Sequence, residues 1–397
     1  MKLPSLPKKK ADRRKFLSFV ALTAGVLVLL WWRLGSLLPG FNHTELVTSR
    51  APLGLHDLYN HPLYLPLKLV QTIVFHLFPD HGLLLTRLPA TVFGGLAILA
   101  FAYVLRQWHG GRTAAFATLL FATSAWTLHS SRLASFDVLY LWALPTLLLA
   151  HLTMQRRSQS AYVFYGSMLL WGVCLYIPGL VWFVLLSMYL QRKAIATGWK
   201  HLEAAWQKAL YVLAGLIWLP VLLHDLVKHS ADLRLWLGLP DHFAAPLTLL
   251  KHFVAVPVHL FVRGPQYPEN WLGRAPILDI FSLMICALGI YFYLRHWRAS
   301  RSRLLGGYFI LGFILVGIGG AVSLSLLVPL LYLVAATGIA YLLHDWLQTF
   351  PLNPIARGLG VGLVAAAVVL SCNYNLRAYF VAWPHNETTQ ATFRYRP

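Results

Sequence analysis

The chain has 397 residues, of which 58% are hydrophobic and 12% are charged. Soluble domains carry about 25% charged residues. This composition, with a mean hydropathy of +0.61, therefore excludes a chain of soluble domains and places most of it in a lipid bilayer. The net charge of +20 also occurs in nucleic-acid-binding proteins. Here, however, the basic residues lie at the ends of apolar runs, where they set the orientation of membrane helices.

Apolar runs recur along the whole chain, and a membrane helix needs about 20 such residues. The first run follows the basic clusters 8–10 and 13–15 and ends at Trp31-Trp32-Arg33 without a small-residue cleavage site, so we predict a retained signal anchor. The sequence around 176–179 is interpreted as a turn between two helices, because basic residues on both flanks favour the same side. The eleven predicted spans are 16–36, 88–105, 113–130, 137–154, 161–176, 178–191, 208–224, 276–294, 304–322, 326–346 and 359–374.

The distribution of charge predicts the orientation. The segments assigned to the cytoplasmic side contain 20 Lys and Arg against 3 acids, whereas the outer segments contain 13 against 10. The rule that cytoplasmic loops are rich in Lys and Arg places the N-terminus in the cytoplasm. Eleven spans then put the C-terminus outside, in a multi-pass protein of the inner or plasma membrane. We expect a single all-α domain over residues 1–397, with no separate soluble domain.

Two outer segments, 37–87 and 225–275, are longer than simple connections, and long loops in compact proteins are usually functional. Residues 62–78 are apolar and are predicted to form a helix in the membrane interface, because a span there would spoil the charge distribution. We expect further interfacial helices in the second segment. The two outer segments together are predicted to form the active-site face.

The acids carry the most information about function. No acid lies in mid-membrane in this topology, whereas an ion-driven transporter usually keeps one there. Glu45 follows the first span and suits a general base; the alternative is a solvated residue or helix cap. Asp137 lies at the next outer turn, five residues after Arg132, and is either a second active-site acid or the partner of that arginine.

Basic and polar residues near the predicted interfacial helix suit the binding of a phosphate at the water–lipid boundary, or of lipid headgroups. Known catalytic motifs are absent from the sequence: it has no Gly-rich phosphate loop in a strand–helix setting and no zinc-protease motif. The three cysteines form no CxxC pair and are interpreted as packing residues. The candidate residues of the first outer segment are His56, Asp57, His61, Lys68 and Arg87.

The order of several short motifs resembles the GT-C glycosyltransferases that use polyprenyl-phosphate sugars, near the protein O-mannosyltransferases and bacterial aminoarabinose transferases. The motifs are the acid Glu45, the segment His61-Pro62-Leu63-Tyr64, the Arg87-Leu88-Pro89-Ala90 start of the second span, the basic inner turn 106–112, and Arg132 with Asp137. They cover about the first 155 residues; the late Leu- and Pro-containing span 327–340 agrees in hydropathy. Where the family has an acid pair, this chain has Thr44 followed by Glu45.

The resemblance implies a GT-C-like bundle and an inverting transfer of sugar from a polyprenyl-phosphate donor to a protein, lipid or glycan on the extracytoplasmic face. It implies Glu45 as general base and Asp137 as the residue that orients the acceptor. If a divalent metal cation takes part, Glu45 and Asp137 would hold it. His61, Lys68 and Arg87 would bind the donor phosphate, together with Arg263 and Arg274 of the second outer segment. Supporting roles fall to Arg132, His56 and Asp57.

Three other functions remain open from the sequence. A transporter or flippase for a lipid-linked sugar would need polar residues deep within several spans, and these are sparse. A ligase or polymerase for lipid-linked sugars shares the donor. A non-catalytic scaffold would tolerate replacement of both Glu45 and Asp137. No nucleic-acid partner is expected.

Overall fold

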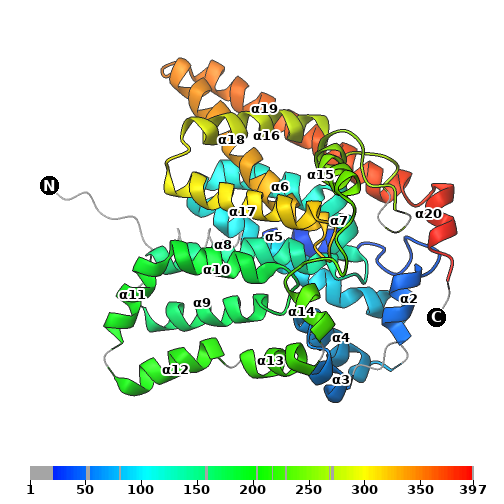
Figure 1. Ribbon diagram of the computed structural model, residues 1–397. Coiled ribbons are helices and arrows are strands. Elements are labelled where there is room, and N and C mark those ends of the chain that lie inside the picture. Colours follow the sequence, from blue (N-terminus) through cyan, green and yellow to red (C-terminus); the bar gives the residue numbers. More distant parts are fainter. Residues whose placement is uncertain are drawn as a thin grey trace.

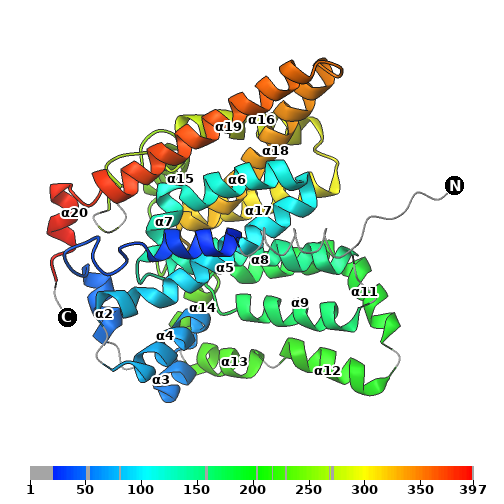
Figure 2. The same cartoon turned by 180° about the vertical axis from the view of Figure 1, so that it is seen from behind.

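The computed structural model describes residues 21–50, 54–79, 82–156, 160–202, 204–216, 218–228, 230–267, 269 and 272–395. In these ranges all regular structure is helical apart from one isolated β-bridge. The helices lie side by side in a bundle, and several short helices gather at one end of it (Figures 1 and 2). We call this the loop end; it contains α2 (His43–Arg50), α3 (Leu55–Asn60), α4 (Leu65–Leu77), α14 (Ser230–Trp236) and α20 (Glu387–Thr392).

The remaining helices form the body of the bundle. They follow a first helix over Ala21–Trp31. In chain order they are α5 (Leu83–His109), α6 (Gly111–Thr123), α7 (Ala125–Arg132), α8 (Asp137–Arg156), α9 (Ala161–Cys174), α10 (Leu180–Leu190), α11 (Arg192–His201), α12 (Ala205–Leu216), α13 (Leu219–Lys228), α15 (Pro246–Phe261), α16 (Ile280–Arg295), α17 (Ser300–Gly317), the 3₁₀ turn η2 (Leu324–Leu326), α18 (Leu327–Thr349), α19 (Pro354–Arg377) and the π-helical η3 (Ala378–Ala382).

The chain is an all-α, multi-pass membrane protein. Five helical stretches in the described residues are long and apolar enough to cross a bilayer, and shorter apolar helices accompany them. The exact number of eleven spans therefore stays a prediction. The five long stretches are Leu83–His109, Asp137–Arg156, Ala205–Lys228, Leu324–Thr349 and Pro354–Ala382.

Two boundaries inside the bundle can be compared with the sequence. The prediction of two helices around 176–179 is confirmed: α9 ends at Cys174 and α10 begins at Leu180, after Gly179 with a φ of +78°. The span predicted over 113–130 is instead divided into α6 and α7 at Ser124. The amide oxygen of Asn375 accepts a hydrogen bond from the Ala125 N–H (3.2 Å), so a distant side chain satisfies a backbone group at this break.

The loop end is fixed by contacts between the start and the end of the chain. Phe41 and Tyr395 exchange backbone hydrogen bonds of 2.7 and 3.2 Å. Gly40 permits this approach, because a Cβ there would collide with the Tyr395 carbonyl. The helix predicted over 62–78 is observed as α4, and its position in the membrane interface stays a prediction; the second outer segment contains α14 and α15. The last helices therefore return to the same end as the first outer segment.

Helices α16 and α18 pack closely because both carry glycine at their contact. A Cβ on Gly338 would lie 3.1 Å from the Gly289 nitrogen and would collide with the Ile285 carbonyl. Small residues at such crossings let membrane helices approach. We expect Gly338→Ala to lower stability by about 1–3 kcal/mol through overpacking, measured by thermal unfolding in detergent. Gly362→Ala is the control, since nothing lies within 4 Å of its Cβ position; equal melting temperatures would contradict this packing.

Candidate active site

Two cavities open at the loop end, and the adjacent residues Phe136 and Asp137 each line one of them. The first, which we call the Lys68 cavity, has a volume of about 410 Å³. The second, the Asp137 cavity, has a volume of about 340 Å³. The Lys68 cavity is lined by His43, Thr44, Val47, Thr48, Lys68, Gln71 and Phe136. The Asp137 cavity is lined by Trp126, Asp137, His252, Ala255, Val256, His259, Pro265, Tyr267, Val316 and residues 319–324.

Asp137 is the first residue of α8, where the helix dipole favours a negative charge. Its carboxylate interacts with the Ser323 hydroxyl and lies near Glu269 and Tyr64. The preceding ring, Phe136, stacks on Tyr64 with ring centroids 4.1 Å apart. The side chain is partly exposed and faces the cavity. Asp137 is therefore a carboxylate that a substrate hydroxyl can reach.

Tyr64 links the first outer segment to this turn. Its backbone has a φ of +63°, which is uncommon for a residue with a side chain, and its N–H donates to the Tyr176 carbonyl (2.7 Å). Burial raises the pKa of Tyr64 to about 12, so its hydroxyl stays protonated. Strained backbone of this kind is often found at functional sites; here it sets the ring that supports Phe136.

A second carboxylate, Glu269, reaches the site from the second outer segment. The Thr44 hydroxyl donates to its Oε2 (2.8 Å), and its charge acts on Asp137. Thr44 stands where the resembling family has the first acid of its pair. The sequence does not predict this role for Glu269, since nothing in the spacing of the second segment distinguishes it from the other outer acids. The one feature of the sequence that points to it is Thr44, which replaces an acid of the family's pair and contacts Glu269.

Glu45 and Arg87 form a buried ion pair with exposed fractions of 0% and 1%. Arg87 Nε donates to Oε1 and Nη2 to Oε2, both at 2.8 Å. The backbone N–H groups of Ala134 (3.1 Å) and Asn42 (3.3 Å) donate to the same two oxygens. A carboxylate offers about four lone-pair positions, and all four are engaged here. The pair joins α2, α5 and the turn before α8.

This geometry argues against the roles that the sequence predicted for both residues. A general base needs a free lone pair within reach of its substrate, and Glu45 has neither the free position nor the exposure. Its oxygens accept N–H donors, so it is also unsuited to hold a metal cation. Arg87 additionally donates to the carbonyls of Leu34 (3.3 Å) and Gly40 (3.2 Å), which leaves it buried and away from a donor phosphate.

Lys68 is the predicted phosphate-binding residue that faces a cavity. It lies on α4, and its Nζ donates to the His61 carbonyl (2.8 Å). Burial lowers the pKa of Lys68, and the nearby Asp225 and Asp232 partly offset this effect. The side chain thus connects the Lys68 cavity with a neighbouring acidic group.

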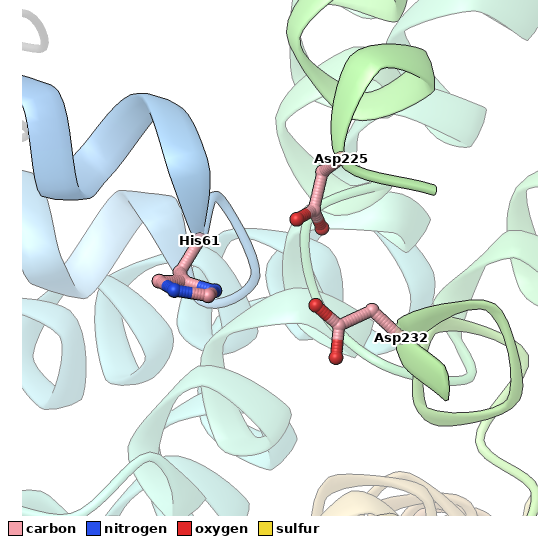
Figure 3. A group of neighbouring side chains, drawn as sticks. All are labelled: His61, Asp225 and Asp232. Carbon is pink, nitrogen blue, oxygen red and sulfur yellow. The ribbon is translucent and has the colours of Figure 1, made fainter. Parts of the chain in front are cut away.

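That group consists of His61, Asp225 and Asp232, whose ligand atoms all lie within 4.8 Å of one another. Figure 3 shows the three side chains converging, with His61 on the chain between α3 and α4, Asp225 on α13 and Asp232 on α14. One imidazole nitrogen and two carboxylates suit a divalent cation such as Zn²⁺ or Mn²⁺. Two acids beside His61 would repel a phosphate. The donor set therefore fits a cation better than the direct phosphate contact predicted for His61.

Metal binding at this group is directly testable. We expect 1 mM MnCl₂ to raise the melting temperature of the purified protein, because a cation that binds only the folded state stabilises it. Asp232→Asn should remove most of that increase. Asp241→Asn, at an exposed acid outside the group, should retain it. An equal response of both variants would show that Mn²⁺ acts elsewhere.

The other predicted residues lie apart from the two cavities. Arg132 does not pair with Asp137: it donates to the carbonyls of Leu29 (3.3 Å) and Trp32 (2.6 Å) and stacks on Phe380 at 4.6 Å. The pairing failed because α7 turns the arginine towards the end of the first helix. His56 contacts Asn60 (3.0 Å), and Asp57 caps α3 by accepting from Gly54 N–H (3.1 Å). Arg263 and Arg274 are exposed and line neither cavity.

Comparison with known proteins gives structural matches without sequence matches. No family model matches the chain, and no curated protein matches it. ArnT from Cupriavidus metallidurans in the apo state superimposes with a TM-score of 0.60 at 16% identity, covering 95% of this chain and 78% of that one. The same protein bound to undecaprenyl phosphate gives 0.58 at 14%, covering 94% and 78%.

An archaeal protein shows the same likeness over a smaller share of its length. The oligosaccharyltransferase from Archaeoglobus fulgidus, tethered to an acceptor peptide, gives a TM-score of 0.50 at 14% identity. This chain is covered to 94%, and 56% of the archaeal chain is matched. At these identities the matches establish the fold: the chain has the GT-C fold of these transferases.

Proposed function

We propose that the protein is an inverting glycosyltransferase that moves a sugar from a polyprenyl-phosphate donor to an acceptor on the extracytoplasmic side. The observation that carries the proposal is that the adjacent residues Phe136 and Asp137 line two cavities, one with the Lys68 ammonium group and the other with the Asp137 carboxylate. Transfer needs these two groups on opposite sides of the reacting carbon. The GT-C fold, and the undecaprenyl phosphate bound by the structurally similar ArnT, support the proposed transfer.

The Lys68 cavity suits the donor phosphate. It lies beside α4, an apolar helix that the sequence places in the membrane interface. A polyprenyl phosphate keeps its tail in the bilayer and its headgroup at this depth. The ammonium group of Lys68 would stabilise the charge that develops on the departing phosphate. A divalent cation held by His61, Asp225 and Asp232 would neutralise the two acids close to Lys68, which would otherwise repel the phosphate.

The Asp137 cavity suits the acceptor. The hydroxyl oxygen of the acceptor attacks the anomeric carbon of the donor sugar and forms the new C–O bond. The bond between the anomeric carbon and the phosphate oxygen breaks, and its electron pair leaves with the phosphate. The hydroxyl proton passes to the Asp137 carboxylate, which we assign as the base in place of Glu45. Attack from the face opposite the phosphate inverts the anomeric configuration. Glu269, held by Thr44, is positioned beside Asp137 to orient the acceptor.

The proposal is tested by incubating the purified protein with a panel of radiolabelled polyprenyl-phosphate sugars and peptide, lipid and glycan acceptors. Release of polyprenyl phosphate is followed in parallel. Turnover of one donor with inversion at the anomeric carbon would support transfer. Donor binding without turnover, together with movement of intact donor across a vesicle membrane, would instead support a transporter. A ligase or polymerase would move an oligosaccharide rather than a single sugar.

A further inference from the structure

A third cavity lies at the end of the bundle opposite the loop end, and the proposed transfer does not use it. With a volume of about 680 Å³ it is larger than either of the two loop-end cavities. It surrounds the junction of α5 and α6 and the ends of α16 and α18, where α17 begins. Helix α5 carries Arg87 near one end and His109 at the other. At 1.5 Å per residue these two residues are roughly 33 Å apart, about one hydrocarbon thickness.

The lining is positively charged. Arg112 and Arg301 carry this charge, and no carboxylate is among the described residues that line it. Arg156 adds a further positive charge near Arg301. Such a cavity attracts an anion, and arginine matches the geometry of phosphate oxygens through paired N–H donors.

Contacts already hold the key groups in place. The Arg301 guanidinium lies 4.7 Å from the centre of the Trp108 ring and also interacts with the Tyr293 hydroxyl, so two contacts position it at the cavity wall. The Thr337 hydroxyl joins the Tyr293 hydroxyl (2.7 Å) to His109 Nε2 (3.2 Å). These contacts reduce the ordering that an incoming anion would otherwise require.

The rest of the wall is apolar. Phe292, Leu343 and Leu347 line the same cavity, so a ligand there meets both a cationic and a hydrocarbon surface. A soluble phosphate uses only the first of these. A phosphate ester on a lipid uses both, and the end of a membrane bundle is where such headgroups lie.

We propose that this cavity is a second anion site, which binds the phosphate headgroup of a membrane lipid in the leaflet opposite the active site. Arg112 and Arg301 contact the phosphate, and the apolar wall receives the start of the acyl chain. The site is separate from the proposed transfer and does not depend on it.

The full chain is purified in detergent, and its affinity for dioleoylphosphatidylglycerol is measured by native mass spectrometry. Dioleoylphosphatidylcholine and inorganic phosphate are the comparison ligands. We expect saturable binding of phosphatidylglycerol that weakens about tenfold or more in Arg112→Gln and in Arg301→Gln, because each change removes a charge-assisted contact to the phosphate. The control is Arg298→Gln, which removes an arginine stacked on Trp297 at 5.2 Å outside the cavity.

Arg112 is exposed, so its variant tests the site without endangering the fold. Inorganic phosphate that displaces the lipid only at millimolar concentration would support the lipid headgroup as ligand. Inorganic phosphate that binds with the same arginine dependence, while the lipid does not, would reassign the anion site to a free phosphate. Lipid binding that is unchanged in Arg112→Gln and Arg301→Gln, or reduced equally in Arg298→Gln, would overturn the proposal.

Discussion

Replacing Asp137 with asparagine is expected to lower kcat for sugar transfer by about 10²–10⁴-fold, the usual contribution of a general base. The amide keeps the size of the side chain and can still contact the Ser323 hydroxyl, so the fold at the start of α8 should persist. Because the change removes proton acceptance rather than donor binding, KM for the polyprenyl-phosphate sugar should stay nearly constant. Initial rates at varied donor concentration separate these two effects.

Asp241→Asn serves as the matched control, since this acid of the second outer segment is exposed and lines neither of the two loop-end cavities. Its rate should equal that of the unchanged protein. A folded Asp137→Asn variant with full activity would remove Asp137 from the chemistry. Glu269→Gln would then be the variant to examine, because its carboxylate is the other one held at this site.

The second large effect concerns the buried ion pair. Glu45→Gln or Arg87→Met should each destabilise the protein by about 3–5 kcal/mol, because either change leaves the partner charge buried and uncompensated. Thermal or denaturant unfolding in detergent measures this loss. Activity should fall with the folded fraction, and conditions that restore the fold should restore the rate.

A double-mutant cycle distinguishes this structural role from a catalytic one. The cycle measures Glu45→Leu, Arg87→Met and the double variant, which replaces both charges by apolar groups, a change that is often nearly neutral for a buried pair. We expect the double variant to be more stable than either single variant and to regain activity. A Glu45→Gln variant that melts normally yet does not transfer sugar would return the role of base to Glu45.

The fold was accessible from the sequence because it depends on hydropathy and on the placement of charges. The helix pair around Gly179 followed from basic residues on both flanks, and α4 followed from its apolar composition after Pro62. The break at Ser124 was not predictable, since it is stabilised by Asn375, 250 residues away along the chain. The predicted number of eleven spans is not established either, because helix length and composition identify five candidates among the described residues.

The site was less accessible, for a related reason. A sequence pattern identifies which residues are polar, but their roles depend on the partners they meet. Glu45 and Arg87 were chosen for their chemistry, and each turned out to satisfy the other. Glu269 was passed over because its partner Thr44 is 225 positions distant. Asp137 and Lys68 both face cavities, and their roles in transfer stay predictions.

The bridge between Phe41 and Tyr395 has a consequence for biosynthesis. Tyr395 leaves the ribosome 354 residues after Phe41, whereas the ion pair of Glu45 with Arg87 spans only 42 positions. The first half of the loop end can therefore form while most helices are still being inserted, but its closure must wait for the last of them. A nascent chain arrested after α18 would contain the ion pair and lack the bridge. Arrested chains would accordingly be more accessible to protease around residue 41 than the released protein.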